Sequence, residues 1–374
     1  IRDSGKAPDA AAGCYLDAAR LARPAALKLA DSGRERDLLL IYNEACASLT
    51  SLLKKQGQDW SRPARFQGPL RSHRLSLGRP AADRADWNDF DVLVPADRVM
   101  LRHIKLERRR QHGLGGAMVG HHARRGDEPF VPPVGLSRPL NACLDFRGGT
   151  DRAELVIRDM IKVDHAGIGG RRVPLAADRT ASLAYLYRYA PKGNVGFMGL
   201  LHPADYDPQT DLYQLAPLDP DKIPVILVHG LMSSPETWVN MVNELQLDPV
   251  LRENYQAVVF RYPTGYPIGQ NAASLRAKLA AYRAQYETPR SRRNMRQMVL
   301  IGHSMGGILS SWQIRDSGDA IRKMVLTVPL EELEVTPEER KGIANIIEFD
   351  ANPDVRRAIF MAAPHRGSKV ASRA

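Results

Sequence analysis

Apolar positions recur at helical spacing near the start of the chain. The first run spans residues 8 to 23, is interrupted by Pro24, and is followed by a second run from Leu38 to Leu53. Apolar side chains three and four positions apart share one face of a helix. We therefore expect residues 1–58 to form a helical hairpin packed on something larger. The first run consists of Ala11, Ala12, Tyr15, Leu16, Ala19, Leu21 and Ala22.

Residues 59–215 have a different pattern. Short apolar, β-prone runs alternate with Gly, Pro and Asp, which favour turns. The clearest runs are Asp91–Pro95, Leu155–Ile157 and Asn194–Leu201, and Pro132-Pro133 marks a loop between them. This pattern predicts an irregular β-rich accessory region, whose role the sequence does not assign.

From residue 216 to residue 374, short apolar runs alternate with longer helix-prone segments. That alternation predicts a mostly parallel sheet with helices on both faces, hence an α/β fold class for this part. Residues 324–352 interrupt the alternation and are too long for an ordinary connection, so they form either a cap over a pocket or a peripheral packing helix. The expected strands are Val225–Val228, Ala257–Phe260, Met298–Ile301 and Ala358–Ala362, and the expected helices are Glu236–Leu245, Ala272–Tyr286 and Gly307–Arg315.

The most informative motif surrounds Ser304. The apolar run Met298–Ile301 leads directly into Gly302-His303-Ser304-Met305-Gly306, and a helix-prone segment follows. A Gly-x-Ser-x-Gly motif between a strand and a helix is typical of a nucleophile elbow, a strained turn that exposes a serine hydroxyl above the sheet. The turn leaves no room for side chains two positions on either side of the serine, which Gly302 and Gly306 satisfy.

A second motif lies about seventy residues earlier. Val225–Val228, a strand of the buried type, is followed by His229-Gly230-Leu231. Acyl transfer needs hydrogen-bond donors directed at the oxyanion of a tetrahedral intermediate. We expect these donors to be the backbone N–H groups of Met305 and Leu231, with Met232 as the alternative to Leu231.

These motifs resemble those of the α/β-hydrolase family, in its bacterial lipase and esterase branch. The residues that carry the resemblance are Val228–Leu231, Gly302–Gly307 and Ile359–Ser368, so it covers roughly residues 215 to 374. It implies an α/β-hydrolase core and a serine hydrolase that works through an acyl-enzyme intermediate on an ester or lipid-like substrate. It also implies a bacterial envelope setting, while the sequence itself leaves the location open.

A serine nucleophile needs a histidine base and a carboxylate that orients it. His365 is the only histidine after Ser304, and Asp350 lies between them, so a formal triad exists. In the family, however, the base follows later strands than the one that ends near His365. We therefore expect the acid and the base to lie beyond Ala374, and this chain to hydrolyse simple esters weakly or not at all. His303 and His229 are expected to support the site rather than to act as the base.

Composition sets further limits. The net charge is +11, the basic residues are densest between Arg98 and Arg125, and the chain has three cysteines. The basic stretch lacks interleaved aromatics and any nucleic-acid motif, so we expect no nucleic-acid partner; a solvated surface is the first interpretation and peripheral membrane association the alternative. No metal-ligand spacing and no phosphate-binding Gly-rich loop occurs, so we expect no metal and no cofactor. Oligomeric state stays open.

Two other functions remain compatible with the sequence. An acyltransferase or a thioesterase would use the same nucleophile, because the first half-reaction is shared. A non-catalytic interaction module with a decayed hydrolase site is the alternative from another class. Its motivation is the missing acid and base, and the intact elbow argues against it.

Overall fold

The protein's structure is a computed structural model that describes residues 8–30, 37–101, 106–146, 151–168, 170–189 and 210–367. It forms two compact units. The first comprises Ile1–Arg125 and Pro133–Ala190, and the second Gly126–Pro132 and Pro191–Ala374. The helical hairpin and most of the β-rich region, which we expected to be separate domains, thus share one unit, because both helices bury their apolar faces on its sheet. The stretch Gly126–Pro132, which we expected in the β-rich region, belongs to the second unit.

The hairpin consists of α1 (Pro8–Leu29) and α2 (Asp37–Lys55). The expected interruption at Pro24 is wrong, since α1 continues through it. Proline inside a helix removes one backbone hydrogen bond. Ala19, Ala22 and Ala26 are nevertheless buried on the same face before and after Pro24, so packing keeps the helix continuous.

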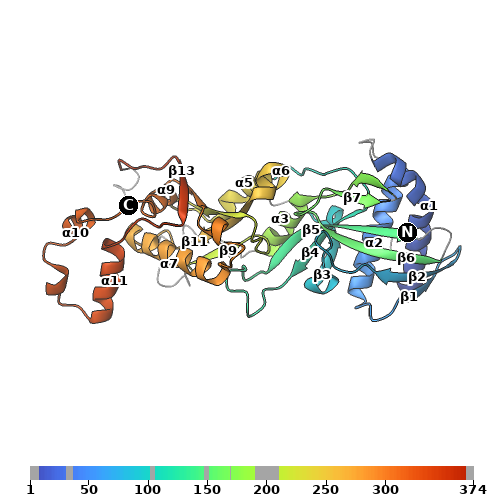
Figure 1. Cartoon of the computed structure of the whole chain (residues 1–374), viewed down its shortest axis with the longest axis horizontal. Helices are drawn as coiled ribbons and strands as arrows, with labels where there is room; N and C mark the ends of the chain where they lie inside the picture. The colour runs from blue at the N-terminus through green and yellow to red at the C-terminus, as the bar shows by residue number, and fades with distance from the viewer. Residues whose placement is uncertain are drawn as a thin grey trace. The chain divides into compact units, whose positions relative to one another are not determined.

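The β-rich region is more regular than expected. It forms a six-stranded sheet in the order β1-β2-β6-β5-β4-β3 and a separate pair, β7-β8 (Figure 1). The predicted run 194–201 lies outside the described residues. The elements are β1 (Ala64–Gln67), β2 (Ser72–Leu77), η2 (Trp87–Asp89), β3 (Val92–Pro95), η3 (Ala96–Arg98), β4 (Gly116–His122), β5 (Leu136–Phe146), β6 (Arg152–Asp159), β7 (His165–Ile168), β8 (Arg171–Pro174) and α3 (Arg179–Tyr189).

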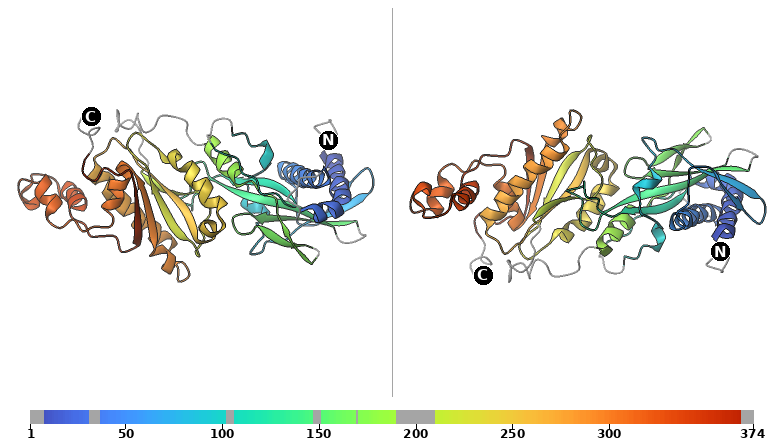
Figure 2. Two further views of the ribbon diagram at one scale, coloured as in Figure 1. Left: turned by 90° about the horizontal axis from the view of Figure 1, so that it is seen from above. Right: turned by 90° about the horizontal axis from the view of Figure 1, so that it is seen from below.

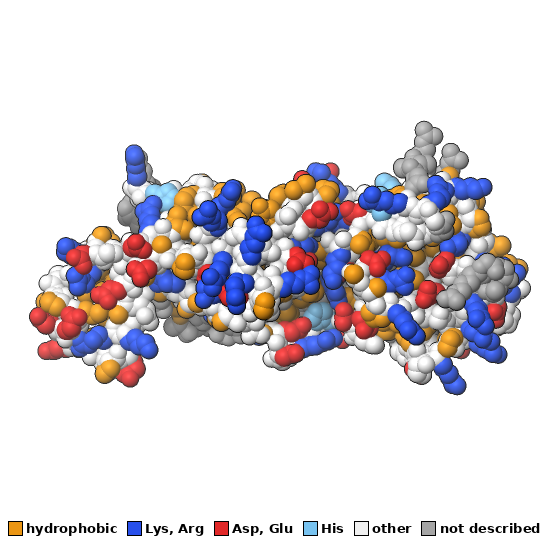
Figure 3. Space-filling view, viewed as in Figure 1, with side chains coloured by type: hydrophobic (Ala, Val, Ile, Leu, Met, Phe, Trp, Pro, Cys, Tyr) orange, Lys and Arg blue, Asp and Glu red, His pale blue; other side chains and the backbone are white. Residues whose placement is uncertain are grey.

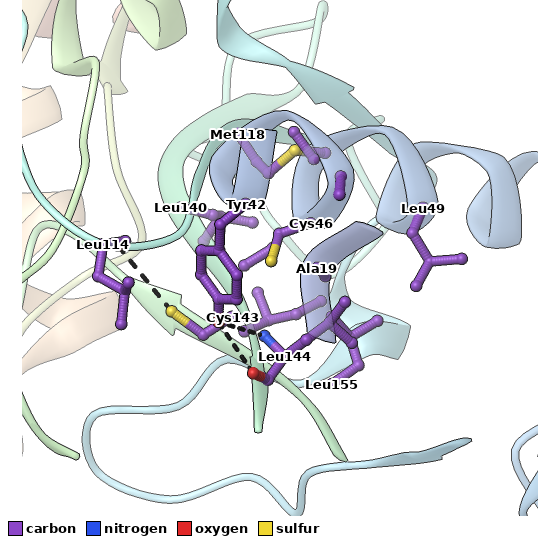
Figure 4. Close-up of a cluster of buried hydrophobic side chains, with 14 of the residues drawn as sticks. Ala19, Tyr42, Cys46, Leu49, Leu114, Met118, Leu140, Cys143, Leu144 and Leu155 are labelled. Carbon is purple, nitrogen blue, oxygen red and sulfur yellow. Dashed lines mark hydrogen bonds between the residues drawn. The ribbon is translucent and has the colours of Figure 1, made fainter. Parts of the chain in front are cut away.

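Tyr42 anchors the core between α2 and this sheet. Its side chain is fully buried, and its hydroxyl donates to the backbone oxygen of Leu144 at 2.9 Å while accepting from the N–H of Leu144 at 3.1 Å (Figure 4). Cys46 and Cys143 are buried in the same cluster as free thiols. Cys14 is also a free thiol.

The second unit is built on a mixed five-stranded sheet in the order β13-β12-β10-β11-β9. The pairs β10–β11, β10–β12 and β12–β13 are parallel, and β9 runs antiparallel to β11. Helices lie on both faces of this sheet (Figure 2). The elements are β9 (Asp211–Gln214), β10 (Ile223–Val228), η4 (Pro235–Trp238), α5 (Val239–Leu247), α6 (Pro249–Asn254), β11 (Tyr255–Arg261), α7 (Ile268–Tyr286), α8 (Arg292–Met295), β12 (Met298–His303), α9 (Met305–Ser311) and β13 (Val355–Met361).

The expected insertion is present between α9 and β13. It contains α10 (Ala320–Val325), η5 (Leu330–Glu332) and α11 (Pro337–Ile347), which starts with a capping box between Thr336 and Glu339. After α11, Phe349 stacks on Trp312 and is covered by the guanidinium of Arg276 from α7. These contacts attach the insertion to α7 and to the end of α9.

Two searches of the described residues bear on membrane and metal association. No described helix combines the length and the apolar character that crossing a bilayer requires. Within the same residues, no three His, Cys, Asp or Glu side chains converge as a metal site would need.

Candidate active site

Ser304 is strained. It occupies the single position between β12 and α9. Its φ of 53° and ψ of −121° define a backbone conformation that residues other than glycine rarely adopt. Its N–H donates to the backbone oxygen of Met361 at 2.8 Å, and its own backbone oxygen accepts from Gly307 N–H at 3.0 Å. Such strain costs about 1–3 kcal/mol and persists only where the surrounding structure imposes it.

The two elbow glycines sit where no side chain fits. A Cβ atom at Gly302 would lie 2.4 Å from the backbone oxygen of Gly306, and one at Gly306 would lie 2.2 Å from that of Val228. Because both obstacles are backbone atoms, rotamer changes cannot relieve the overlap. The turn thus requires glycine at both positions, as the sequence motif predicts.

Strain is concentrated at one edge of the sheet. Among the described residues, the non-glycine residues with positive φ are Met232, Ser304 and Ala362, at 55°, 53° and 49°. They follow β10, β12 and β13, which are parallel neighbours, so all three lie at the carboxyl ends of these strands. In open α/β sheets this is the edge at which ligands bind.

The loop after β10 passes directly beside Ser304. A Cβ atom added to Gly230 would lie 3.0 Å from Ser304 Cβ and 3.2 Å from His303 Nδ1. Leu231, the next residue, is half-buried, whereas the N–H of Met232 already donates to Thr264 Oγ1 at 3.4 Å. Met305 is the first residue of α9, so its N–H has no carbonyl four residues earlier to bind within the helix.

His229 is buried beneath this loop. Its ring stacks on Tyr262 with centroids 4.3 Å apart, and its Nδ1 lies 3.1 Å from the backbone oxygen of Gly230. Burial lowers the pKa of His229 to about 4, and the nearby charge of Arg261 acts in the same direction. The ring is therefore neutral at pH 7. Together with the stack on Tyr262, this suits a bracing role better than proton transfer.

His365 occupies the turn that follows β13. It is exposed, and its ring packs edge-on against Phe360, with centroids 4.8 Å apart. Asp350 is also exposed. In the described part of the chain, no hydrogen bond connects Ser304 Oγ, His365 and Asp350, so the formal triad is not assembled here.

Tyr262 and Thr264 belong to the site but were not singled out from the sequence. The Tyr262 hydroxyl donates to the backbone oxygen of His229 at 2.6 Å, and Thr264 accepts from Met232 N–H at 3.4 Å. Both residues follow the buried strand β11 at the same carboxyl edge as Ser304. That position after an apolar run was the available signal.

The second unit thus has an α/β sheet with a strained serine between β12 and α9 at its carboxyl edge. Residues 225–372 match the model of the alpha/beta hydrolase family, which confirms the resemblance for this part of the chain. A search of curated proteins found no match to this chain.

Two solved structures of a Bacillus licheniformis lipase, BlEst2, are similar to part of the chain. The mature form shares 22% identity at a TM-score of 0.26, with 43% of this chain and 50% of the lipase chain covered. The propeptide form shares 22% identity at a TM-score of 0.25, with 41% of this chain and 25% of the lipase chain covered. The chain thus spans half or less of these lipases, and so slight a likeness adds nothing to the family match.

Proposed function

We propose that this protein is a serine ester hydrolase in which Ser304 is the nucleophile. The observation that carries the proposal is the backbone of Ser304, held at φ 53° between two positions that admit only glycine. Packing alone gives no reason to keep a serine in that conformation, because glycine would adopt it without strain. Strain retained at a sheet edge where ligands bind favours a chemical role for the hydroxyl.

In the proposed reaction, Ser304 Oγ attacks the ester carbonyl carbon and its proton passes to a general base. The N–H groups of Met305 and Leu231 bind the oxyanion of the tetrahedral intermediate. The alcohol then leaves with a proton, and water hydrolyses the acyl-serine. Removal of one such donor typically costs about 2.7–4 kcal/mol of transition-state stabilisation.

Covalent labelling with a fluorophosphonate probe tests the nucleophile. We expect the label on Ser304, located by peptide mass spectrometry, with none on Ser304→Ala. Ser72→Ala, which removes an exposed hydroxyl from β2, is the matched control and should label as the unmodified chain does. Equal labelling of the unmodified chain and Ser304→Ala would contradict the proposal and favour a non-catalytic interaction module.

The same assay tests the base. We expect His365→Ala to label at an unchanged rate, because the His365 ring is exposed and packs on Phe360. We also expect weak turnover of p-nitrophenyl butyrate by this chain, since no histidine among the described residues forms a hydrogen bond with Ser304 Oγ. A labelling rate about 100-fold lower in His365→Ala than in the unmodified chain would instead assign His365 as the base.

A further inference from the structure

The arginines of the first unit differ in whether a carboxylate binds them. Many of them bind carboxylates, including Arg108 of the densest basic stretch, which pairs with Asp178 at 2.5 Å. Figure 3 accordingly shows Lys and Arg side chains mixed with Asp and Glu over the face in view. Other paired arginines include Arg23 with Asp145, Arg98 with Glu44, Arg109 with Glu107, Arg110 with Asp178, Arg138 with Asp89 and Asp159, Arg158 with Asp83, and Arg179 with Asp164.

Arg65 and Arg74 lack such a partner in the described part of the chain. Within the described residues, neither side chain has an ion pair or a hydrogen bond to a carboxylate. They nevertheless lie directly opposite each other in the antiparallel register of β1 and β2. Directly opposed residues project from the same face of a sheet, and like charges in that position destabilise it.

The row of arginines continues onto a third strand. Arg74 is also in register with Arg152 of β6, so Arg65, Arg74 and Arg152 stand side by side across β1, β2 and β6. The next row along the same face contains Ser76 and Glu154, so the positive row is limited to this end of the sheet. Phe66 and His73, which alternate with the arginines, are buried on the opposite face.

A pocket opens at these residues. Its volume is about 620 Å³, and its lining includes Arg62, Arg65 and Arg74 together with Gln58 and Asp59. Asp59 is the carboxylate of the lining, but its two oxygens accept from Ser61 N–H at 2.9 Å and from Ser61 Oγ at 2.7 Å. Those bonds tie the Asp59 side chain to its own turn rather than to Arg65 or Arg74.

We propose that this pocket binds a phosphate group, supplied by a small phosphorylated molecule or by a lipid headgroup. Arginine presents a planar set of N–H donors that matches phosphate oxygens, and a dianion between Arg65 and Arg74 offsets their mutual repulsion. This site lies in the first unit and is independent of the proposed chemistry at Ser304.

Thermal unfolding of the full chain, with inorganic phosphate as the probe, tests the proposal. Phosphate is compared with sodium chloride at equal ionic strength, because salt alone screens exposed charges. We expect phosphate to raise the melting temperature of the unmodified chain, since a ligand that binds the folded state stabilises it. Arg65→Gln and Arg74→Gln should each lose most of that rise, and Arg74→Lys should keep part of it. Arg293→Gln, which removes one exposed charge from the second unit, should keep all of it.

The melting temperatures of the same variants without phosphate give a second test. Arg65→Gln and Arg74→Gln remove a like-charge pair, so their melting temperatures should equal or exceed that of the unmodified chain. A clear decrease in both would mean that the arginines stabilise the fold, and would overturn the proposal. A phosphate-dependent rise that survives in both variants would overturn it as well.

Co-sedimentation with phosphatidylglycerol–phosphatidylcholine vesicles separates the two sources of phosphate. Binding that Arg74→Gln abolishes and inorganic phosphate competes away identifies a lipid headgroup. A phosphate-dependent rise in melting temperature without vesicle binding identifies a small phosphorylated ligand. Vesicle binding that Arg65→Gln and Arg74→Gln leave unchanged contradicts the assignment of this pocket.

Discussion

The hydroxyl of Tyr262 donates a hydrogen bond to the backbone oxygen of His229 at 2.6 Å, while the two rings stack 4.3 Å apart. Tyr262 follows β11 and His229 follows β10, so one side chain connects the ends of two adjacent strands. The residue after His229 is Gly230, whose backbone passes next to Ser304. The position of the loop beside the proposed nucleophile therefore depends on Tyr262, which acts through His229.

Tyr262→Phe should separate this hydrogen bond from the ring stack. The ring remains, but the backbone oxygen of His229 loses a buried donor, which costs about 1 kcal/mol of unfolding free energy. A looser loop also misplaces the N–H of Leu231, so we expect fluorophosphonate labelling of Ser304 to slow several-fold. Urea denaturation and labelling rates measure the two effects. Unchanged labelling despite lower stability would show that Tyr262 does not position the loop.

The strain at Ser304 predicts a difference between two substitutions that both remove the hydroxyl. Ser304→Gly relieves the positive φ, whereas Ser304→Ala retains it. We expect Ser304→Gly to be more stable than Ser304→Ala by about 1 kcal/mol, and neither to be labelled at residue 304. Equal stabilities in urea denaturation would mean that the elbow is not strained.

Gly306→Ala and Gly342→Ala are the same substitution at two sites, and we expect them to change stability in opposite directions. An added Cβ at Gly306 meets the backbone oxygen of Val228 at 2.2 Å, so the substitution should destabilise the second unit by about 1–3 kcal/mol. At Gly342, within α11, nothing lies within 4 Å, and alanine should stabilise by about 0.5–1 kcal/mol. Chemical denaturation distinguishes the two, and a neutral Gly306→Ala would contradict the tight elbow.

The four parallel strands of the second unit were predictable from short apolar runs in the sequence, whereas the antiparallel edge strand β9 was missed. Continuous apolar runs such as Val225–Val228 and Met298–Ile301 are buried on both faces, and the observed strands contain both runs. The elbow was predictable for a related reason, since only glycine fits at residues 302 and 306. In both cases the requirement is local, so a short stretch of sequence carries it.

Features that depend on distant contacts were less predictable. Pro24 marks a break in the local pattern, yet α1 continues because buried alanines on both sides pack against other elements. The regular pairing of six strands between residues 64 and 159 likewise depends on long-range register. No sequence motif marks Tyr262, because its role depends on the position of His229, 33 residues earlier.

The buried ring of His229 predicts a pH dependence of stability. Its pKa is lowered to about 4 by burial, whereas an unfolded histidine titrates near 6.5. Between these values the unfolded chain binds the proton and the folded chain does not, so stability falls as pH decreases from about 6.5 to about 4. The loss from this residue alone is on the order of 3 kcal/mol.

His229→Phe keeps an aromatic ring on Tyr262 but does not titrate, so its stability should depend less on pH across this range. Urea denaturation of the unmodified chain and of His229→Phe between pH 4 and 7 measures the difference in their unfolding free energies. Both proteins have the same carboxylates, so the titration of these groups cancels in that difference. Parallel pH profiles would show that His229 is accessible to protons in the folded state, and would remove the argument that it braces the loop as a neutral ring.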